Sequence, residues 1–320
     1  MQNTKTKKIG VDVGNYDVKT QHCKIASGYE TYEKKPQITK HCLDYKGQYY
    51  VPDISKRMEY KKDKTENNQC IILTLFGISE ELLYIAKNSG NDIQAELDSM
   101  DSIKLGIGLP PGHFNDLAKK TLEYYQNEFS DTVEYYYNDY HFKFTVETIR
   151  IFPQDFVAVF KNSKCETAKM KRYYIVGIGG GTVDVIPVIN GSPDVNNCFS
   201  LKKGTREMYK YIAIKLKNEL QLEDEEEIED NLIEDVIIGE KTVLDGSIIE
   251  KINAYAEEYV ERLINIDLKE KHKVNLGNYP SVFFGGGGLL LRQYIEQYVK
   301  NCEILEDVNA NAKSYALCLD

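Results

Sequence analysis

The stretch that decides the fold runs from Ile175 to Asp184 and reads Ile-Val-Gly-Ile-Gly-Gly-Gly-Thr-Val-Asp. The apolar residues on both sides predict two buried strands, over residues 173–178 and 183–189, joined by a tight turn. Consecutive glycines weaken strand structure, so a close approach of the backbone to a phosphate group explains them better than structure alone. Asp184 adds a carboxylate beside this turn. A purely structural hairpin is the alternative.

A similar strand–turn–strand pattern opens the chain. Residues 9–19 read Ile-Gly-Val-Asp-Val-Gly-Asn-Tyr-Asp-Val-Lys, which predicts a strand over 8–13, a turn over 14–17 and a returning strand over 18–25. Gly14 and Asn15 allow backbone N–H groups to close around an anion, and Lys19 supplies a cation. A carboxylate such as Asp12 near a phosphate usually holds Mg²⁺, directly or through water. An ordinary hairpin is again the alternative.

A third glycine-rich segment lies in the C-terminal part of the chain. A predicted strand over residues 281–284 leads into four glycines, Gly285 to Gly288, and then into a predicted helix over residues 289–299. Bare backbone at such a strand-to-helix turn suits a nucleotide base or phosphate. The segment matches neither the dinucleotide-binding pattern nor the Walker pattern.

Composition excludes several classes of protein. The 320 residues include 40 Lys and Arg against 50 Asp and Glu, and the net charge of −10 argues against a broad DNA-binding surface. The seven cysteines show no Cys-x-x-Cys spacing, which favours reduced thiols over a disulfide framework or a zinc site. No stretch approaches the roughly 18 uninterrupted apolar residues of a membrane span, and residues 1–8 lack the apolar core of a signal peptide. We therefore expect a cytoplasmic protein.

The rest of the chain reads as mixed α/β. Helices are predicted over residues 71–87, 114–125, 154–161, 205–220 and 247–264, a strand over 103–109, and a hairpin around Asn138-Asp139. The lysine-rich residues 58–68 predict an exposed loop, which is either a subunit contact or simply solvated. Each half of the chain opens with a strand, a glycine-containing turn and a returning strand, which indicates two related lobes.

Taken in their order along the chain, the three glycine-rich segments resemble those of the actin, sugar-kinase and heat-shock chaperone superfamily. Within it, three segments look most like the bacterial plasmid-partition ParM and Alp proteins: residues 106–110, 150–154 and 309–315. The resemblance implies a two-lobed α/β, ribonuclease H-like fold with the nucleotide cleft between the lobes. Lobe I would comprise residues 1–160 and about 303–320, and lobe II would comprise residues 161–302.

The resemblance also implies roles for individual residues. The first phosphate loop would contain Asp12, Gly14, Asn15 and Lys19, and the second Gly179, Gly180, Gly181, Thr182 and Asp184. The adenosine site would be Gly285, Gly286, Gly287 and Gly288, and Lys203, Gly204 and Glu207 would contact ribose and base, with a plain surface helix as the alternative. Asp12 and Asp184 would hold the metal, and Gln154, Asp184 and Asp12 would serve catalysis.

Three positions depart from the family pattern. Gly177 stands where the second loop usually begins with Asp, which implies slower hydrolysis or reliance on Asp12 and Asp184 alone. Gln154 stands where ParM-like proteins often carry Glu, and a glutamine there resembles eukaryotic actin. An amide can orient a water molecule but cannot act as a strong general base. Ser314 replaces the usual glycine of the C-terminal signature.

The function implied is that of a polymerising ATPase (ATP or GTP with Mg²⁺) whose hydrolysis controls filament stability in plasmid DNA segregation. Its partners would be further copies of itself and a centromere-bound DNA-binding adaptor protein, with no direct nucleic-acid or membrane contact. The alternatives are a small-molecule kinase of the same superfamily and a cell-shape actin homologue. The kinase usually has a longer chain, and the cell-shape protein commonly has an amphipathic membrane-binding end, whereas residues 1–8 are polar after Met1.

Overall fold

The computed structural model describes residues 5–37, 40–59, 61–162, 164–220 and 228–319. The chain divides into two compact units. Unit 1 comprises Met1–Lys161 and Asn309–Asp320, and unit 2 comprises Asn162–Val308. Residues 303–308 therefore fall in unit 2, although the sequence assigns them to the first lobe.

Among the described residues of unit 1, nine strands form one sheet in the order β3-β2-β1-β7-β9-β8-β5-β6-β4. The central strands β1, β7 and β9 are parallel, and β1 is buried from Ile9 to Val13, as expected for a parallel strand covered on both faces. The strands are β1 (Thr6–Val13), β2 (Asp17–Lys19), β3 (Lys24–Ala26), β4 (Gly28–Tyr32), β5 (Leu43–Tyr45), β6 (Gln48–Arg57), β7 (Ser102–Leu109), β8 (Val133–Tyr137) and β9 (Tyr140–Pro153).

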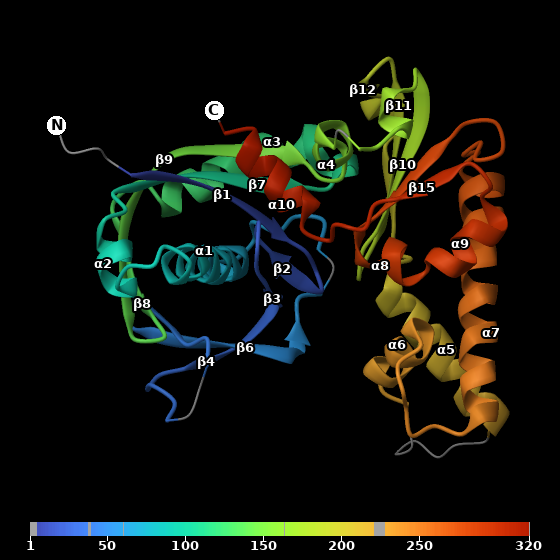
Figure 1. The fold of residues 1–320 in the computed structure, drawn as a ribbon, viewed down its shortest axis with the longest axis horizontal. Coiled ribbons are helices and arrows are strands. Elements are labelled where there is room, and N and C mark those ends of the chain that lie inside the picture. Colours follow the sequence, from blue (N-terminus) through green and yellow to red (C-terminus); the bar gives the residue numbers. More distant parts are fainter. Residues whose placement is uncertain (1–4, 38–39, 60, 163, 221–227, 320) are drawn as a thin grey trace. The chain divides into compact units, whose positions relative to one another are not determined.

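The core helix of unit 1 is α1 (Gln69–Lys87), around which the sheet curls (Figure 1). By its length and by a mean hydropathy of 1.5 over 18 residues, this helix could cross a membrane. However, 78% of those 18 residues is buried inside the protein. A helix that is apolar on all sides is what the core of a folded unit requires. The other helices of unit 1 are α2 (Ile93–Asp98), α3 (Pro111–Glu128), α4 (Phe156–Lys161) and α10 (Ala310–Leu317).

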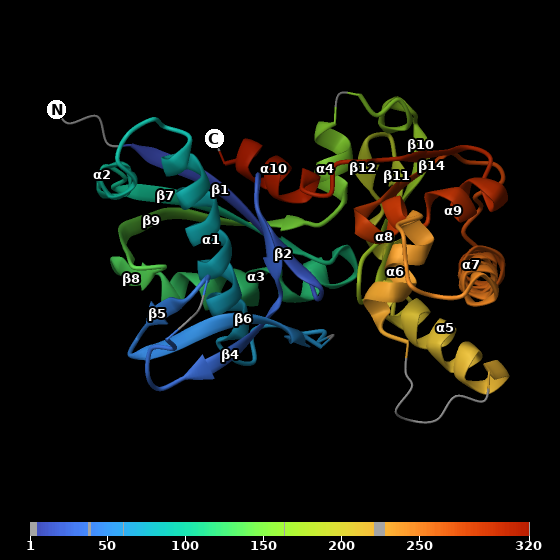
Figure 2. The ribbon, with the colours of Figure 1, turned by 60° about the horizontal axis from the view of Figure 1, so that its bottom comes forward.

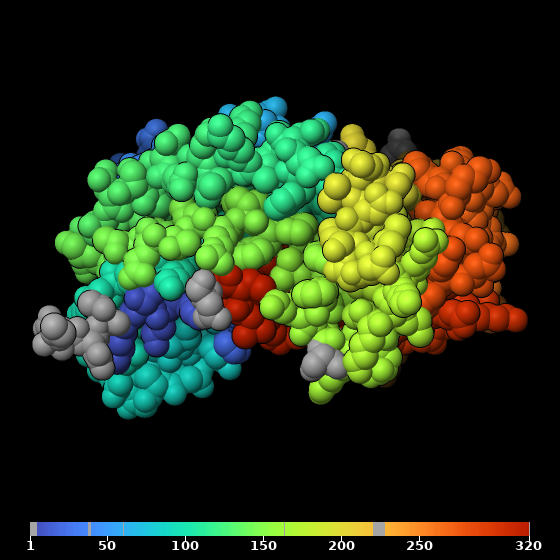
Figure 3. Space-filling view, turned by 90° about the horizontal axis from the view of Figure 1, so that it is seen from above, coloured from blue at the N-terminus to red at the C-terminus, as the bar shows by residue number. Residues whose placement is uncertain are grey.

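Strand β1 lies between α1 and α10 (Figures 1 and 2). Side chains alternate between the faces of a strand, so Gly10 and Asp12 face α10 while Val11 faces α1. A Cβ atom on Gly10 would lie 1.9 Å from the carbonyl oxygen of Ala312, so only glycine lets α10 pack this closely. Figure 3 shows red atoms of the C-terminal segment at the surface of unit 1, beside green atoms of the same unit.

Unit 2 contains a sheet of six described strands in the order β12-β11-β10-β14-β15, with β13 paired to β11. The strands are β10 (Arg172–Ile178), β11 (Val183–Ile189), β12 (Ser192–Pro193), β13 (Phe199–Leu201), β14 (Ser281–Phe284) and β15 (Cys302–Ile304). The helices are α5 (Thr205–Leu220), α6 (Asp230–Ile238), α7 (Gly246–Glu261), α8 (Gly285–Leu290) and α9 (Arg292–Tyr298). Helix α7 continues directly into a π-helix over Arg262–Lys271.

Most predicted elements are confirmed, with three corrections. The predicted strand over residues 18–25 is two short strands, β2 and β3, separated by a turn in which Thr20 N donates to the carbonyl of Cys23. The four glycines predicted as a turn form the helix α8. Residues 58–68 are not uniformly exposed, because Met58 is only 2% exposed; residue 60 lies outside the described residues.

Candidate functional site

The first glycine-containing hairpin joins β1 to β2. Asp12 lies directly opposite Lys19 in the strand register, and Lys19 forms no ion pair with any residue that the structure describes. A Cβ atom on Gly14 would lie 2.7 Å from the carbonyl oxygen of Asp17, so the tight turn requires glycine. The backbone N–H of Asn15 donates to no other described group. The hairpin thus offers an N–H group and a lysine to an anion.

Two amide side chains hold the carboxylate of Asp12, which is 9% exposed. Gln154 Nε2 donates to Asp12 Oδ1 at 2.7 Å, and Asn311 Nδ2 donates to Asp12 Oδ2 at 3.2 Å. Each carboxylate oxygen still has a second lone pair. The carboxylate is therefore fixed in place and can accept hydrogen bonds from metal-bound water, which fits Mg²⁺ held through water. No cluster of three or more His, Cys, Asp or Glu residues suited to direct metal binding occurs among the described residues.

Gln154 lies between β9 and α4, two residues before the helix begins, and its backbone N–H donates to the carbonyl of Leu109. The sequence predicts this residue at the helix start, which is correct to within two residues. A carboxylate only accepts hydrogen bonds, so the amide nitrogen must face Asp12. Gln154 Oε1 is then the atom that can accept from a water molecule.

The second hairpin joins β10 to β11 and packs on the N-terminus of α5. Backbone N–H groups of Thr205 and Arg206 donate to the carbonyls of Gly179 and Gly180, both at 3.0 Å. These carbonyls satisfy donors that a helix N-terminus leaves unpaired. The N–H groups of Gly180 and Gly181 donate to nothing else in the described parts of the chain, so they can bind an anion.

Gly204 explains how α5 comes so close to this hairpin. A Cβ atom there would lie 2.5 Å from the carbonyl oxygen of Gly179 and 2.6 Å from that of Gly180. Gly204 is thus a packing residue for the hairpin. The contact with ribose and base that the resemblance implies for it stays a prediction.

Asp184 is 7% exposed and accepts hydrogen bonds from two hydroxyl groups. Thr182 Oγ1 donates to Asp184 Oδ2 at 2.9 Å, and Ser200 Oγ donates to Oδ1. Gly177 lies directly opposite Asp184 in the strand register. The family's usual aspartate at position 177 would therefore face Asp184 across the strand pair, and its absence leaves Asp184 as the carboxylate of this pair.

The four glycines of α8 differ in their surroundings. Gly285 has φ +88°, a conformation that other residues rarely adopt, and a Cβ atom there would lie 2.6 Å from the carbonyl oxygen of Ile178. A Cβ atom on Gly287 would lie 2.5 Å from the side chain of Ile178, whereas one on Gly286 would meet nothing within 4 Å. Gly285 and Gly287 are packing positions, and Gly286 presents open backbone.

This difference gives a testable pair of variants. Gly286→Val is expected to keep the fold and to lower nucleotide affinity, because its side chain would occupy space that is open beside α8. Gly287→Val is expected to destabilise unit 2 by about 1–3 kcal/mol through overpacking against Ile178. Binding of a fluorescent ATP analogue and thermal unfolding measure the two effects. A folded Gly286→Val protein with parental affinity would exclude Gly286 from the nucleotide site.

Lys203 and Glu207 line a small cavity of about 70 Å³ in unit 2. Its complete lining is Lys203, Glu207, Tyr211, Tyr259, Arg262, Leu263 and Asp267. The hydroxyl of Tyr259 donates to the carbonyl of Lys203 at 2.9 Å, which ties α7 to the segment before α5. The sequence indicates the helix that carries Tyr259 but not the face that lines a cavity, so this residue and those of the π-helix are missed by sequence reasoning.

Lys64 is a second residue that sequence reasoning misses. Its Nζ atom donates to the carbonyl of Val13 at 2.7 Å, at the last residue of β1. Asp63 anchors the segment by accepting from Thr65 N and from Lys120 Nζ. Lys64 therefore brings a cation to the first hairpin.

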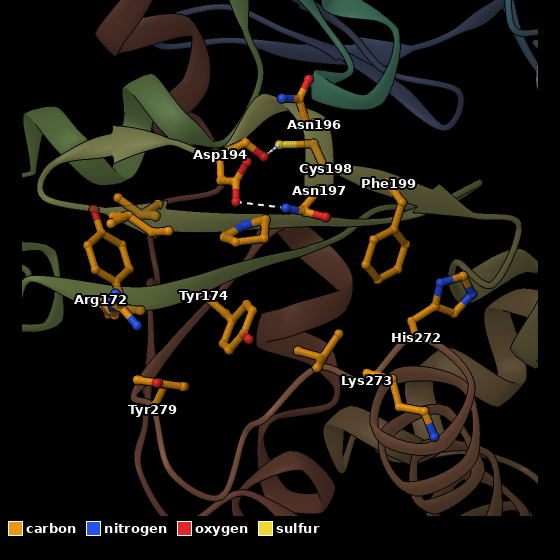
Figure 4. A pocket seen from close by; sticks show the side chains of 15 residues that line it. Arg172, Tyr174, Asp194, Asn196, Asn197, Cys198, Phe199, His272, Lys273 and Tyr279 are labelled. Carbon is orange, nitrogen blue, oxygen red and sulfur yellow. Dashed lines mark hydrogen bonds between the residues drawn. The ribbon is translucent and has the colours of Figure 1, made fainter.

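Unit 2 has another cavity, of about 610 Å³, that contains none of the predicted site residues (Figure 4). Tyr174 is one of the residues that line it, and Phe199 stacks on His272 with ring centroids 4.3 Å apart. The carboxylate of Asp194 accepts from Asn197 at 2.8 Å, the bond dashed in Figure 4. A small molecule would fit this volume, but the cavity lacks a glycine-rich turn for phosphate.

Comparison with solved structures identifies the fold, whereas no family model and no curated protein matches the chain. The archaeal actin homolog Ta0583 aligns with a TM-score of 0.72 at 16% identity, over 96% of this chain and 97% of that chain. A ParM filament from Clostridium botulinum gives 0.70 at 16% identity, over 99% of both chains. Actin-like protein Alp7A gives 0.69 at 17% identity, over 98% of this chain and 95% of that chain. The chain therefore has the actin-like fold of ParM, Alp and archaeal actin homologues, as its sequence predicted.

Proposed function

We propose that this chain is a nucleotide-dependent, filament-forming actin-like protein that hydrolyses ATP or GTP. The observation that carries the proposal is the hydrogen bond of 2.7 Å from Gln154 Nε2 to Asp12 Oδ1. It joins an amide suited to orienting water to a carboxylate beside a hairpin suited to phosphate. Phosphoryl transfer depends mainly on positioning and charge stabilisation, which these groups supply.

Two kinds of structural neighbour support the proposal. Ta0583, at 16% identity and a TM-score of 0.69, has been solved in complex with ADP. The neighbours also include the 15-stranded ParM filament and the Alp12 filament, with TM-scores of 0.70 and 0.64. Nucleotide binding and filament formation are thus properties of proteins that share this fold.

The two hairpins and the glycines of α8 each take a part in this proposal. Lys19 and the N–H of Asn15 bind phosphate oxygens in unit 1, and the N–H groups of Gly180 and Gly181 do so in unit 2. Asp12 and Asp184 would hold Mg²⁺ through its water molecules, and the ion would neutralise phosphate charge. Gln154 Oε1 orients the water molecule that attacks the γ-phosphate.

We further propose that the filament moves plasmid copies apart in a bacterial cytoplasm through a DNA-binding adaptor protein bound at the centromere. The net charge of −10 supports an indirect link to DNA, because phosphate neutralisation requires clustered Lys and Arg. No membrane contact is part of this function.

Light scattering and electron microscopy of the purified protein with ATP, GTP, ADP and no nucleotide test the proposal. Scattering that rises with a nucleoside triphosphate, filaments in the same sample and release of phosphate are the expected results. An unchanged signal with every nucleotide would contradict polymerisation. Transfer of the phosphate to an added sugar would favour the kinase alternative.

A further inference from the structure

The side chain of Asn311 bridges two carboxylates in unit 1. It is 4% exposed and lies at the second residue of α10. Its Nδ2 atom donates to Asp12 Oδ2 at 3.2 Å and to Asp155 Oδ1 at 3.0 Å, and its Oδ1 accepts from the backbone N–H of Asp155 at 2.8 Å. All the hydrogen-bonding atoms of this amide are thus engaged with the two aspartates.

The backbone that Asn311 holds is strained. Asp155 has φ +62°, a region unfavourable for residues other than glycine, and Phe156 N donates to the carbonyl of Gln154 at 2.6 Å. This three-residue turn directs Gln154 toward Asp12. Such a turn persists only when its surroundings enforce it. The two hydrogen bonds between Asn311 and Asp155 are contacts of this kind.

A second residue of α10, Tyr315, lies near the same turn. A Cβ atom on Gly108 would lie 2.3 Å from the hydroxyl oxygen of Tyr315 and 2.8 Å from Cγ of Gln154, so both side chains lie against Gly108. Burial raises the pKa of Tyr315 well above its usual value, and the charges of Asp12 and Asp155 add to this effect, so the hydroxyl stays neutral. Tyr315 of α10 therefore packs against Gly108, the same residue on which Cγ of Gln154 lies.

We infer that Asn311 is a positioning residue for nucleotide hydrolysis, an inference that rests on the proposed function. By bridging Asp12 and Asp155, it fixes the Gln154 amide relative to the carboxylate of the phosphate hairpin. It acts through the two aspartates, with which all its hydrogen-bonding atoms are engaged. Its loss therefore lowers the rate of the chemical step more than it lowers nucleotide affinity.

A merely structural role makes a different prediction for catalysis. Asn311→Asp removes both donated hydrogen bonds and places a third, buried carboxylate against Asp12 and Asp155, so it is expected to destabilise the turn in either role. If Asn311 only supported the fold, folded Asn311→Ala protein would keep the parental kcat. In a positioning role, kcat falls in protein that is still folded.

The experiment compares Asn311→Ala and Asn311→Asp with the matched control Asn309→Asp, which adds the same charge at the N-cap of α10. Steady-state phosphate release gives kcat and KM, and a fluorescent ATP analogue gives affinity. We expect kcat to fall by about 10- to 100-fold in both Asn311 variants, the range for residues that orient others. Affinity and the Asn309→Asp control should match the parent.

Coupling to Gln154 tests whether Asn311 acts through the turn. The double variant Asn311→Ala with Gln154→Ala should be no slower than the slower single variant, because residues acting as a unit are not additive. Asp155→Gly provides a form that tolerates φ +62°. It loses the hydrogen bond from Asn311, and should keep its thermal stability while kcat falls.

The outcomes separate this inference from the proposed function. A parent protein that fails to hydrolyse any nucleotide overturns both. A parent that hydrolyses ATP or GTP, with a parental kcat in folded Asn311→Ala and Asp155→Gly, overturns the positioning role alone. Fully additive losses in the double variant would also overturn it. If Asn311→Ala does not fold, the kcat of Asp155→Gly tests the positioning role alone: a lowered kcat supports it and a parental kcat overturns it.

Discussion

Replacing Asp184 by asparagine is expected to slow nucleotide hydrolysis by about 10- to 100-fold while unit 2 stays folded. Asparagine keeps the shape of the side chain, and its oxygen can still accept the hydrogen bond from Ser200 Oγ. The nitrogen can donate to the hydroxyl oxygen of Thr182, which now donates to Asp184 Oδ2 at 2.9 Å. The substitution therefore removes the charge with little loss of packing.

The large effect is expected because position 177, directly across the strand pair, is glycine and supplies no second carboxylate. Phosphate release at several Mg²⁺ concentrations measures the effect, and excess Mg²⁺ should restore part of the rate. Asp194→Asn is the matched control, since it removes one charge from the same unit. The Asp194 carboxylate accepts a hydrogen bond from Asn197 and is not one of the predicted site residues. Equal rates in parent and Asp184→Asn at low Mg²⁺ would remove Asp184 from the metal site.

Local patterns predict the fold well wherever local residues determine structure. The hairpin around Asn138 and Asp139 is an example: both adopt positive φ, of 50° and 68°, as the turn between two adjacent strands requires. The buried core helix α1 and the helix α5 are also confirmed, because apolar periodicity extends over many residues. The actin-like fold was predicted from the order of the three glycine-rich segments, and the likeness to solved structures confirms it.

Tertiary contacts explain where prediction from the sequence was wrong. Glycine disfavours helix, yet Gly285 to Gly288 are helical. A side chain at Gly287 would collide with Ile178, so packing explains why this position is glycine. Gly287→Val is therefore expected to disturb the fold, whereas Gly286→Val is expected to preserve it.

Long-range contacts likewise explain which site residues were missed. Asn311 lies 299 residues from Asp12, and although it falls in the segment 309–315 that resembles the family, nothing in its alanine-flanked neighbourhood indicates a contact with Asp12. Lys64 lies in a polar, lysine-rich segment whose composition indicates solvent, yet it contacts Val13. Most of the site residues predicted from the sequence lie in or near glycine-rich turns, where the backbone conformation itself points to a function, whereas Gln154 was predicted from the resemblance.

Replacing Gln154 by alanine is expected to slow hydrolysis by at least about tenfold, or about 1.4 kcal/mol in barrier height. Alanine removes both the donor to Asp12 Oδ1 and the oxygen that can accept from the attacking water. Nucleotide-dependent assembly should persist, because Gln154 lies outside the two glycine hairpins proposed to bind phosphate. Filaments would then last longer, since they stay in the triphosphate state.

Gln154→Glu sharpens the test, because it keeps the size of the side chain and reverses the interaction with Asp12. A carboxylate cannot donate to Asp12, so the two charges repel and the side chain must turn away from the hairpin. Glutamate is nevertheless the stronger base, and a base mechanism would make this variant as fast as the parent or faster. A positioning mechanism makes it slow, like Gln154→Ala. Filament lifetime by time-lapse microscopy, together with phosphate release, distinguishes these mechanisms. Filaments of Gln154→Ala that disassemble and release phosphate at the parental rate would rule out Gln154 as the residue that orients water.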